Sequence, residues 1–99
     1  MVTIYIDKSA SMEELGKNDS SNIIVKSIID ELSLNKIEFK IIEFEKIDFK
    51  LDESLVVVSD GWFDIDENFI PKGVGIGVGI DANMSNLKKI TNKVFREDD

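Results

Sequence analysis

The sequence predicts an α/β fold in which a mainly parallel five-stranded sheet packs against two main helices. One reason is the order of patterns: short apolar stretches of strand length alternate with two longer stretches whose apolar residues recur at helical spacing. A second reason is residues 54–59, an unbroken apolar run typical of a strand buried on both faces of a parallel sheet. A third is length, because 99 residues fit one domain, residues 1–99.

The first strand and the first helix follow from the N-terminal third of the chain. Residues 2–6 alternate apolar and mixed side chains and end at Asp7, a pattern that predicts a strand. Residues 8–18 are mostly small, charged or glycine and predict a loop. A polar residue at positions 19–21 can cap a helix that continues to about Leu34. Apolar positions of this helix form one stripe: Ile24, Ile28 and Leu32.

Two alternating segments next along the chain predict a hairpin. Residues 37–41 and residues 47–51 each alternate apolar and polar side chains, and the phase shifts between them. This hairpin would make the third strand antiparallel to the others. Residues 54–59 supply the fourth strand and residues 73–81 the fifth, and a helix near residues 85–95 closes the chain.

These elements predict a Rossmann-like sheet. Its strands would lie in the order third, second, first, fourth, fifth, with the third strand antiparallel. In open α/β sheets, ligands bind at the carboxyl ends of the strands, where the strand order reverses. A site should therefore lie beyond the ends of the first and fourth strands.

Composition excludes several function classes. The chain has no cysteine and no histidine, which excludes disulfides, thiolate zinc sites and histidine catalysis. Its 12 basic and 20 acidic residues give a net charge of −8, which repels phosphate backbones and argues against binding of nucleic acid. Because we see no long apolar run and no signal-peptide pattern, we expect a cytoplasmic protein that does not span a membrane.

A carboxylate and two hydroxyls follow the first strand at a spacing of two residues: Asp7, Ser9 and Ser11. In a tight strand-to-loop turn such side chains can converge on one point, and their hard oxygen atoms suit Mg²⁺ or Mn²⁺. Asp60, followed by Gly61, ends the fourth strand and would reach the same edge of the sheet. The alternative is that Asp7 only stabilises the turn, because serines after aspartate are common turn residues.

Several segments resemble the sequence motifs of von Willebrand factor type A domains. Residues 4–12 resemble the opening strand of that family and its Asp-x-Ser-x-Ser motif. Residues 55–61 resemble the strand that ends in Thr/Ser-Asp-Gly, and residues 75–80 with residues 86–90 are similar to a later strand and the Leu-x-x-Ile helix after it. These motifs occur in the family's order over nearly the whole chain.

The resemblance implies a metal-ion-dependent adhesion site. By this resemblance, Asp7, Ser9 and Ser11 would hold Mg²⁺ or Mn²⁺ directly or through water, and Asp60 would act mostly through water. An acidic group on a partner protein would complete the octahedron. Domains of this family bind and assemble, so the resemblance implies that the chain is not an enzyme and has no catalytic residues.

The chain departs from the family where a threonine should reach the metal. Only about residues 50–54 separate the expected hairpin from the fourth strand, so the threonine-bearing loop and its helices are missing. Asp64 and Asp66 are the candidate substitutes, and a site that binds metal weakly or not at all is the alternative. A metal-dependent phosphoryl-transfer enzyme is a further alternative, but the chain offers it neither histidine nor cysteine.

Loss of the crossover helices also predicts that part of one sheet face is uncovered. An exposed apolar face marks an interaction surface, so we expect either a homodimer or a partner protein with an exposed carboxylate. Aromatic residues near the metal edge are the candidate anchors: Trp62, Phe63 and Phe69. The alternatives are that the last helix covers this face alone, or that the chain is a degenerate metal-free scaffold that uses the face.

Overall fold

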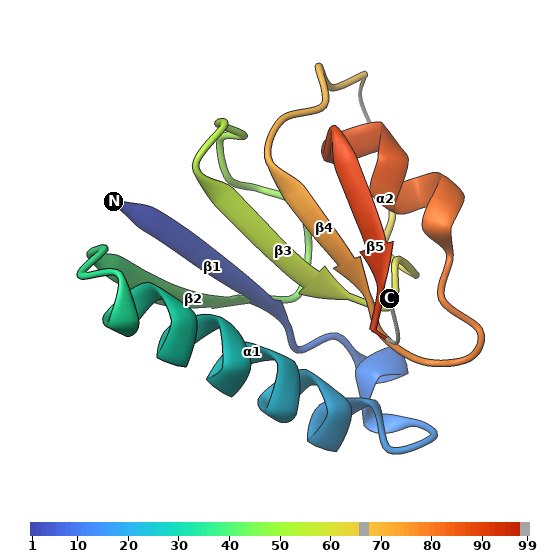
Figure 1. Cartoon of the computed structure of the whole chain (residues 1–99). Helices are drawn as coiled ribbons and strands as arrows, with labels where there is room; N and C mark the ends of the chain where they lie inside the picture. The colour runs from blue at the N-terminus through green and yellow to red at the C-terminus, as the bar shows by residue number, and fades with distance from the viewer. Residues whose placement is uncertain (66–67, 98–99) are drawn as a thin grey trace.

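The computed structural model describes residues 1–65 and 68–97 and confirms the α/β fold class. Within these residues a five-stranded sheet has all its strands parallel, in the order β2-β1-β3-β4-β5 (Figure 1). The strands are β1 (Val2–Asp7), β2 (Phe39–Phe44), β3 (Leu55–Ser59), β4 (Val74–Gly77) and β5 (Lys93–Arg96). The helices are α1 (Lys17–Leu34), α2 (Met84–Ile90) and a short 3-10 helix before α1, η1 (Ala10–Glu13).

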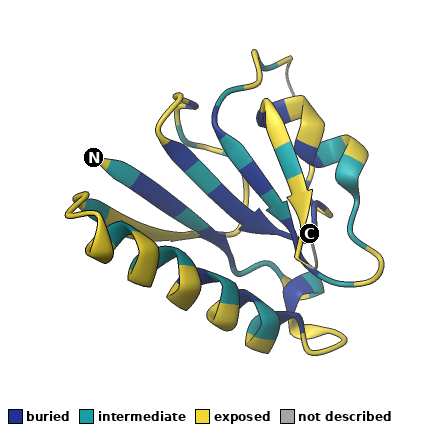
Figure 2. Cartoon of the chain, in the orientation of Figure 1, coloured by how far each residue is buried: buried dark blue, intermediate teal, exposed yellow. Residues whose placement is uncertain are grey.

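Each face of the sheet is covered by its own apolar cluster. On one face, Val25 of α1 belongs to a cluster with Ile4 of β1. On the other face, Leu87 and Ile90 of α2 belong to a cluster with Val57 of β3. The central strands β1 and β3 are therefore buried on both sides, as their apolar sequences predict (Figure 2).

The predicted hairpin is wrong. β2 runs to Phe44 parallel to β1, and residues 47–51 form no strand. Because β2 and β3 flank β1 and point the same way, residues 45–54 return across one face of the sheet to the start of β3. The alternation at residues 47–51 therefore serves packing instead of strand pairing. For example, the Phe49 ring stacks on the Tyr5 ring with centroids 3.8 Å apart.

The predicted last helix is partly wrong, because it ends at Ile90 and the chain then forms the fifth strand of the sheet. Thr91 has an extended backbone, and its hydroxyl donates to the Leu87 carbonyl oxygen at 2.8 Å, so α2 ends there. The Lys93 N–H donates to the Gly73 carbonyl oxygen at 3.3 Å, which sets β5 beside β4. The fifth strand of the sheet is therefore β5, which lies at the edge beside β4 and runs parallel to it. The strand expected instead was residues 47–51, antiparallel and at the opposite edge.

An apolar hollow of about 440 Å³ lies beside α1, over β4 and β5. Its apolar lining comes from both helix and sheet: Ile23, Ile24, Ile28, Ile76 and Phe95. An uncovered apolar surface is therefore present, but it lies on the α1 side of the sheet. The other face carries α2 and residues 45–54, so it is covered by more than the last helix alone.

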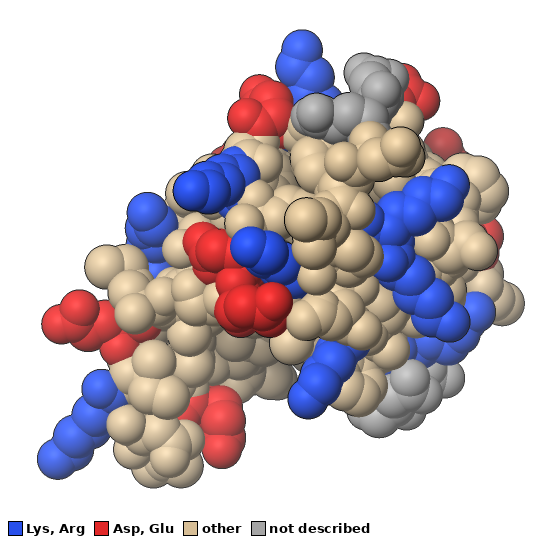
Figure 3. All heavy atoms as spheres, turned by 90° about the horizontal axis from the view of Figure 1, so that it is seen from above, with Lys and Arg blue, Asp and Glu red and all other residues tan. Residues whose placement is uncertain are grey.

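The surface charge is mixed on the side where β3, β4 and β5 begin. Figure 3 views the molecule from above Figure 1, and basic and acidic side chains are interspersed there. The net charge of −8 is therefore not gathered on this side. In the part of the chain that the structure describes, no helix combines the length and the apolar character needed to cross a membrane.

Candidate functional site

Asp7 is the last residue of β1, and its side chain is completely buried at the carboxyl edge of the sheet. Its Oδ1 atom accepts the Ser9 N–H at 2.8 Å, and its Oδ2 atom accepts the Ser59 hydroxyl at 2.6 Å. Both donors are neutral, and none of the ion pairs among the described residues includes Asp7. Because a buried carboxylate without a cationic partner is costly, a cation bound beside Asp7 would lower that cost.

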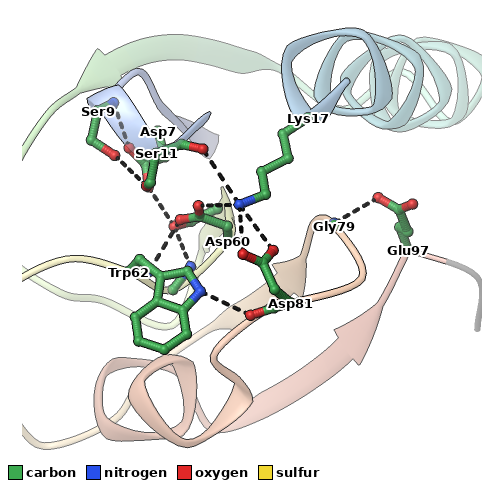
Figure 4. Close-up of polar contacts among 11 residues, drawn as sticks. Asp7, Ser9, Ser11, Lys17, Asp60, Trp62, Gly79, Asp81 and Glu97 are labelled. Carbon is green, nitrogen blue, oxygen red and sulfur yellow. Dashed lines mark hydrogen bonds and ion pairs between the residues drawn. The ribbon is translucent and has the colours of Figure 1, made fainter. Parts of the chain in front are cut away.

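The two predicted hydroxyl ligands lie next to each other. Ser9 has an extended backbone at the start of η1, and its Oγ lies 3.3 Å from Ser11 Oγ (Figure 4). Neighbouring ligands of an octahedral Mg²⁺ site lie about 3.0 Å apart, because each is about 2.1 Å from the ion. The structure therefore brings Asp7, Ser9 and Ser11 together, with the hydroxyls near the spacing of metal ligands.

Asp60, the fourth predicted ligand, is also completely buried, but its carboxylate already has partners. Its Oδ1 atom accepts the Trp62 N–H at 3.1 Å, and its Oδ2 atom accepts a hydrogen bond from the Lys17 ammonium at 3.0 Å. Asp60 thus lies at the predicted edge of the sheet, yet it belongs to an ion pair beside the Asp7 cluster. The residues present fit a cation at Asp7, Ser9 and Ser11 better than one at Asp60.

Lys17 is a site residue that the motifs did not predict. Its side chain, in the first turn of α1, is only 1% exposed. Its Nζ lies 2.9 Å from Asp81 Oδ1 and 3.4 Å from the Ser11 carbonyl oxygen, in addition to the Asp60 contact. The sequence does contain a signal, because Lys17 extends the buried stripe of Ser21 and Val25 by one more helical turn.

The Lys17 side chain is held in its charged form. Burial lowers the pKa of Lys17, but the hydrogen bonds to Asp81 and Asp60 and the charges of both carboxylates outweigh that effect. The pKa of Lys17 is therefore raised above its ordinary value of 10.5. At neutral pH the buried Lys17 side chain consequently carries its full positive charge.

Gly61 makes the turn after β3. Its φ is 78°, and a Cβ at this position would lie 2.3 Å from the Asn83 carbonyl oxygen, so only glycine fits without a shift. Asn83 caps α2, and the side-chain amide of Asn86 donates to the Gly61 carbonyl oxygen at 2.9 Å. The Trp62 indole N–H donates to the Asp81 carbonyl oxygen at 2.8 Å. These contacts fasten the loop after β3 to the loop after β4 and to α2.

A surface hollow of about 300 Å³ opens beside the two serines. Its lining comes from three chain segments: Ser9, Ala10, Ser11, Glu45, Lys46, Trp62, Phe63 and Asp64. Trp62 is 52% exposed, as an anchor should be, whereas Phe63 is 7% exposed and belongs to the core, and Phe69 packs partly buried against that core. Of the two candidate substitutes for the family threonine, Asp64 lines the hollow and Asp66 lies outside the described residues.

The candidate ligand set depends on hydroxyls. Over residues 1–65 and 68–97, no three or more carboxylate, histidine or cysteine side chains form a group that could hold a metal ion. An ion at this edge would therefore be bound by Ser9 and Ser11 and by water as well as by Asp7.

Comparison of the chain with protein-family models, with curated proteins and with solved structures found no match. Membership of the von Willebrand factor type A family therefore stays a prediction from the motifs.

Proposed function

We propose that the chain is a recognition module of the von Willebrand factor A type that binds Mg²⁺ or Mn²⁺ and, through the ion, a carboxylate on a partner protein. The observation that carries this proposal is the completely buried Asp7 carboxylate, whose two hydrogen-bond donors are neutral. Ser9 and Ser11 add two hydroxyl oxygens at a suitable spacing. These three residues would hold the ion, which would supply a positive charge open to an acidic ligand.

The charges at this edge support a divalent ion. The carboxylates of Asp7, Asp60 and Asp81 carry three negative charges, and the paired ammonium of Lys17 carries one positive charge. Two negative charges are thus left without a described partner charge. Because Asp7 and Asp60 are completely buried, solvent screens them only weakly. One divalent cation would balance the remaining charge.

The hollow beside the serines suits an acidic group on a protein surface. Lys46 lines the hollow together with Glu45 and Asp64, so the bound ion would supply the positive charge that attracts an acidic group. Trp62 offers a half-exposed aromatic surface, the type of side chain that most often dominates binding energy at protein interfaces. Its indole is already held by the Asp81 carbonyl oxygen, so little side-chain freedom would be lost on binding.

Titration of Mg²⁺ and Mn²⁺ into the purified chain, followed by calorimetry and by fluorescence, tests the proposal. The chain contains one tryptophan, so the fluorescence reports on Trp62 beside the hollow. We expect saturable binding by the wild type. The double variant Ser9→Ala/Ser11→Ala should bind at least about tenfold more weakly, which corresponds to a loss of about 1.4 kcal/mol of binding free energy.

Ser33→Ala is the matched control, because Ser33 is an exposed serine near the far end of α1. This control should bind metal like the wild type. Acetate added to the metal-loaded protein should change the Trp62 fluorescence, and a chelator should abolish the change. Equal metal binding by the double variant, or no binding by the wild type at millimolar metal, would contradict the proposal.

A second candidate function is a metal-free scaffold that forms a homodimer. The observation that favours it is the apolar hollow beside α1, where Ile23 is 69% exposed and Phe95 is 47% exposed. Absence of metal binding in the titration, together with a dimer mass in light scattering, would favour this function over the first. A monomer that binds metal would exclude it.

A further inference from the structure

Lys17 places a positive charge beside the Asp60 carboxylate, where the resemblance predicts a metal ion. Its Nζ lies 3.0 Å from Asp60 Oδ2, 2.9 Å from Asp81 Oδ1 and 3.4 Å from the Ser11 carbonyl oxygen. Figure 4 shows the side chain reaching from α1 into the space between these groups. Oxygen atoms from three separate loops thus surround one ammonium, much as they would surround a bound cation.

We infer that Lys17 is a tethered cation that takes the place of a metal ion at Asp60 and Asp81. The ammonium holds the loops after β3 and β4 together without a divalent ion, and it competes with any such ion for Asp60. This inference deepens the proposed function, because it separates Asp60 from the ion assigned to Asp7. It does not require that this ion binds in the wild type.

The loop after β4 leaves space for the side chain of Lys17. Gly79 has a φ of 94°, and a Cβ at this position would lie 2.8 Å from Lys17 Cε. The absence of a side chain at Gly79 therefore leaves room for the stem of Lys17. The lysine is 1% exposed and Asp60 is completely buried, so the two charges depend on each other and not on solvent.

A purely structural role and a cation-replacing role predict different responses to metal. If Lys17 only fills space and links the loops, its loss leaves a weaker fold that metal does not repair. If Lys17 replaces an ion, its loss leaves Asp60 and Asp81 as carboxylates that need one. A divalent ion between these two carboxylates and the Ser11 carbonyl oxygen would then take the place of the ammonium, so the affinity for such an ion would rise.

Lys17→Met tests the inference, because methionine keeps most of the apolar stem and removes the charge. In chelator the variant should unfold at a lower temperature than the wild type. Mg²⁺ or Mn²⁺ should restore most of that loss, and calorimetry should show an affinity for Mn²⁺ at least about tenfold higher than that of the wild type.

Two further variants serve as controls. Lys17→Met/Asp60→Asn removes both charges of the buried pair, so it should fold without metal and lose the metal response of the single variant. Lys26→Met removes an exposed lysine of α1 that pairs with Asp30, and it should behave like the wild type. The inference is overturned when Lys17→Met responds to metal no more than the wild type does. It is equally overturned when that variant stays unfolded in saturating Mn²⁺ while the double variant folds.

The same measurements separate this inference from the proposed function. A wild type that binds no metal, with a Lys17→Met variant that does, would support the tethered cation and remove the proposed metal site at Asp7. A wild type that binds metal, with a Lys17→Met variant of unchanged affinity and response, would support the proposed metal site at Asp7 and contradict the tethered cation.

Discussion

Asp60→Ala is expected to lower the free energy of unfolding by about 3–5 kcal/mol, the cost of removing one partner from a buried ion pair. Lys17 would lose its completely buried charged partner and keep Asp81, whose side chain is 43% exposed, and the neutral Ser11 carbonyl oxygen. The Trp62 N–H would lose its acceptor as well, which adds to the loss. Urea unfolding followed by circular dichroism measures the change.

Asp52→Ala is the matched control for this prediction. Asp52 makes similar local contacts, since its Oδ1 accepts the N–H and the hydroxyl of Ser54 at 2.8 and 2.7 Å, but its side chain is exposed and holds no buried charge. Its replacement should cost about 1 kcal/mol or less. Equal losses for the two variants would mean that Asp60 acts only as a turn residue.

Gly61→Ala is expected to cost about 3 kcal/mol, through two separate penalties. A left-handed φ of 78° costs a residue with a Cβ about 1–2 kcal/mol. The new Cβ would also lie 2.3 Å from the Asn83 carbonyl oxygen, and overpacking of this kind costs about 1–3 kcal/mol. Because this contact is with backbone, a simple rotamer change cannot relieve it. Denaturant unfolding again gives the value.

Gly16→Ala separates the two penalties. Gly16 has a similar φ of 71°, but nothing lies within 4 Å of a Cβ built there. This variant should therefore show only the conformational cost of about 1–2 kcal/mol. A loss as large as that of Gly61→Ala would contradict the importance of the contact between the turn after β3 and the cap of α2.

The elements with the simplest patterns could be predicted from the sequence. The unbroken apolar run at residues 54–59 contains β3, a central strand buried on both faces. The helical stripe of Ile24, Ile28 and Leu32 predicted α1, although the helix begins at Lys17, ahead of the expected capping positions. The grouping of Asp7, Ser9 and Ser11 could also be predicted, because a spacing of two residues in a tight turn needs no tertiary information.

Two other elements could not be predicted, because their patterns fit more than one structure. The alternation at residues 47–51 places apolar side chains on a sheet, but it does not show whether the backbone pairs with a strand or only crosses a face. The spacing of Leu87, Ile90 and Val94 fits one helix face, yet Val94 lies in β5. In both segments the backbone partners come from distant residues, which local periodicity does not report.

Lys17 shows the limit of motifs for the site itself. Lysine is almost never completely buried unless it is paired, and its partners Asp60 and Asp81 lie 43 and 64 residues away along the chain. The only local sign is a charged residue on the buried stripe of α1. The motif therefore predicted that Asp60 lies at the edge of the sheet, but it did not predict the Lys17 ammonium that pairs with the Asp60 carboxylate.

The unfolding temperatures of the wild type and Asp7→Asn, each in Mg²⁺ and in chelator, test most directly the claim that a bound cation balances the Asp7 charge. Asparagine keeps the size and an acceptor oxygen but removes the buried charge. We predict that Mg²⁺ stabilises the wild type and leaves the variant unchanged, and that in chelator the variant is the more stable of the two. An equal response of both proteins to Mg²⁺, or no response of the wild type, would contradict the claim.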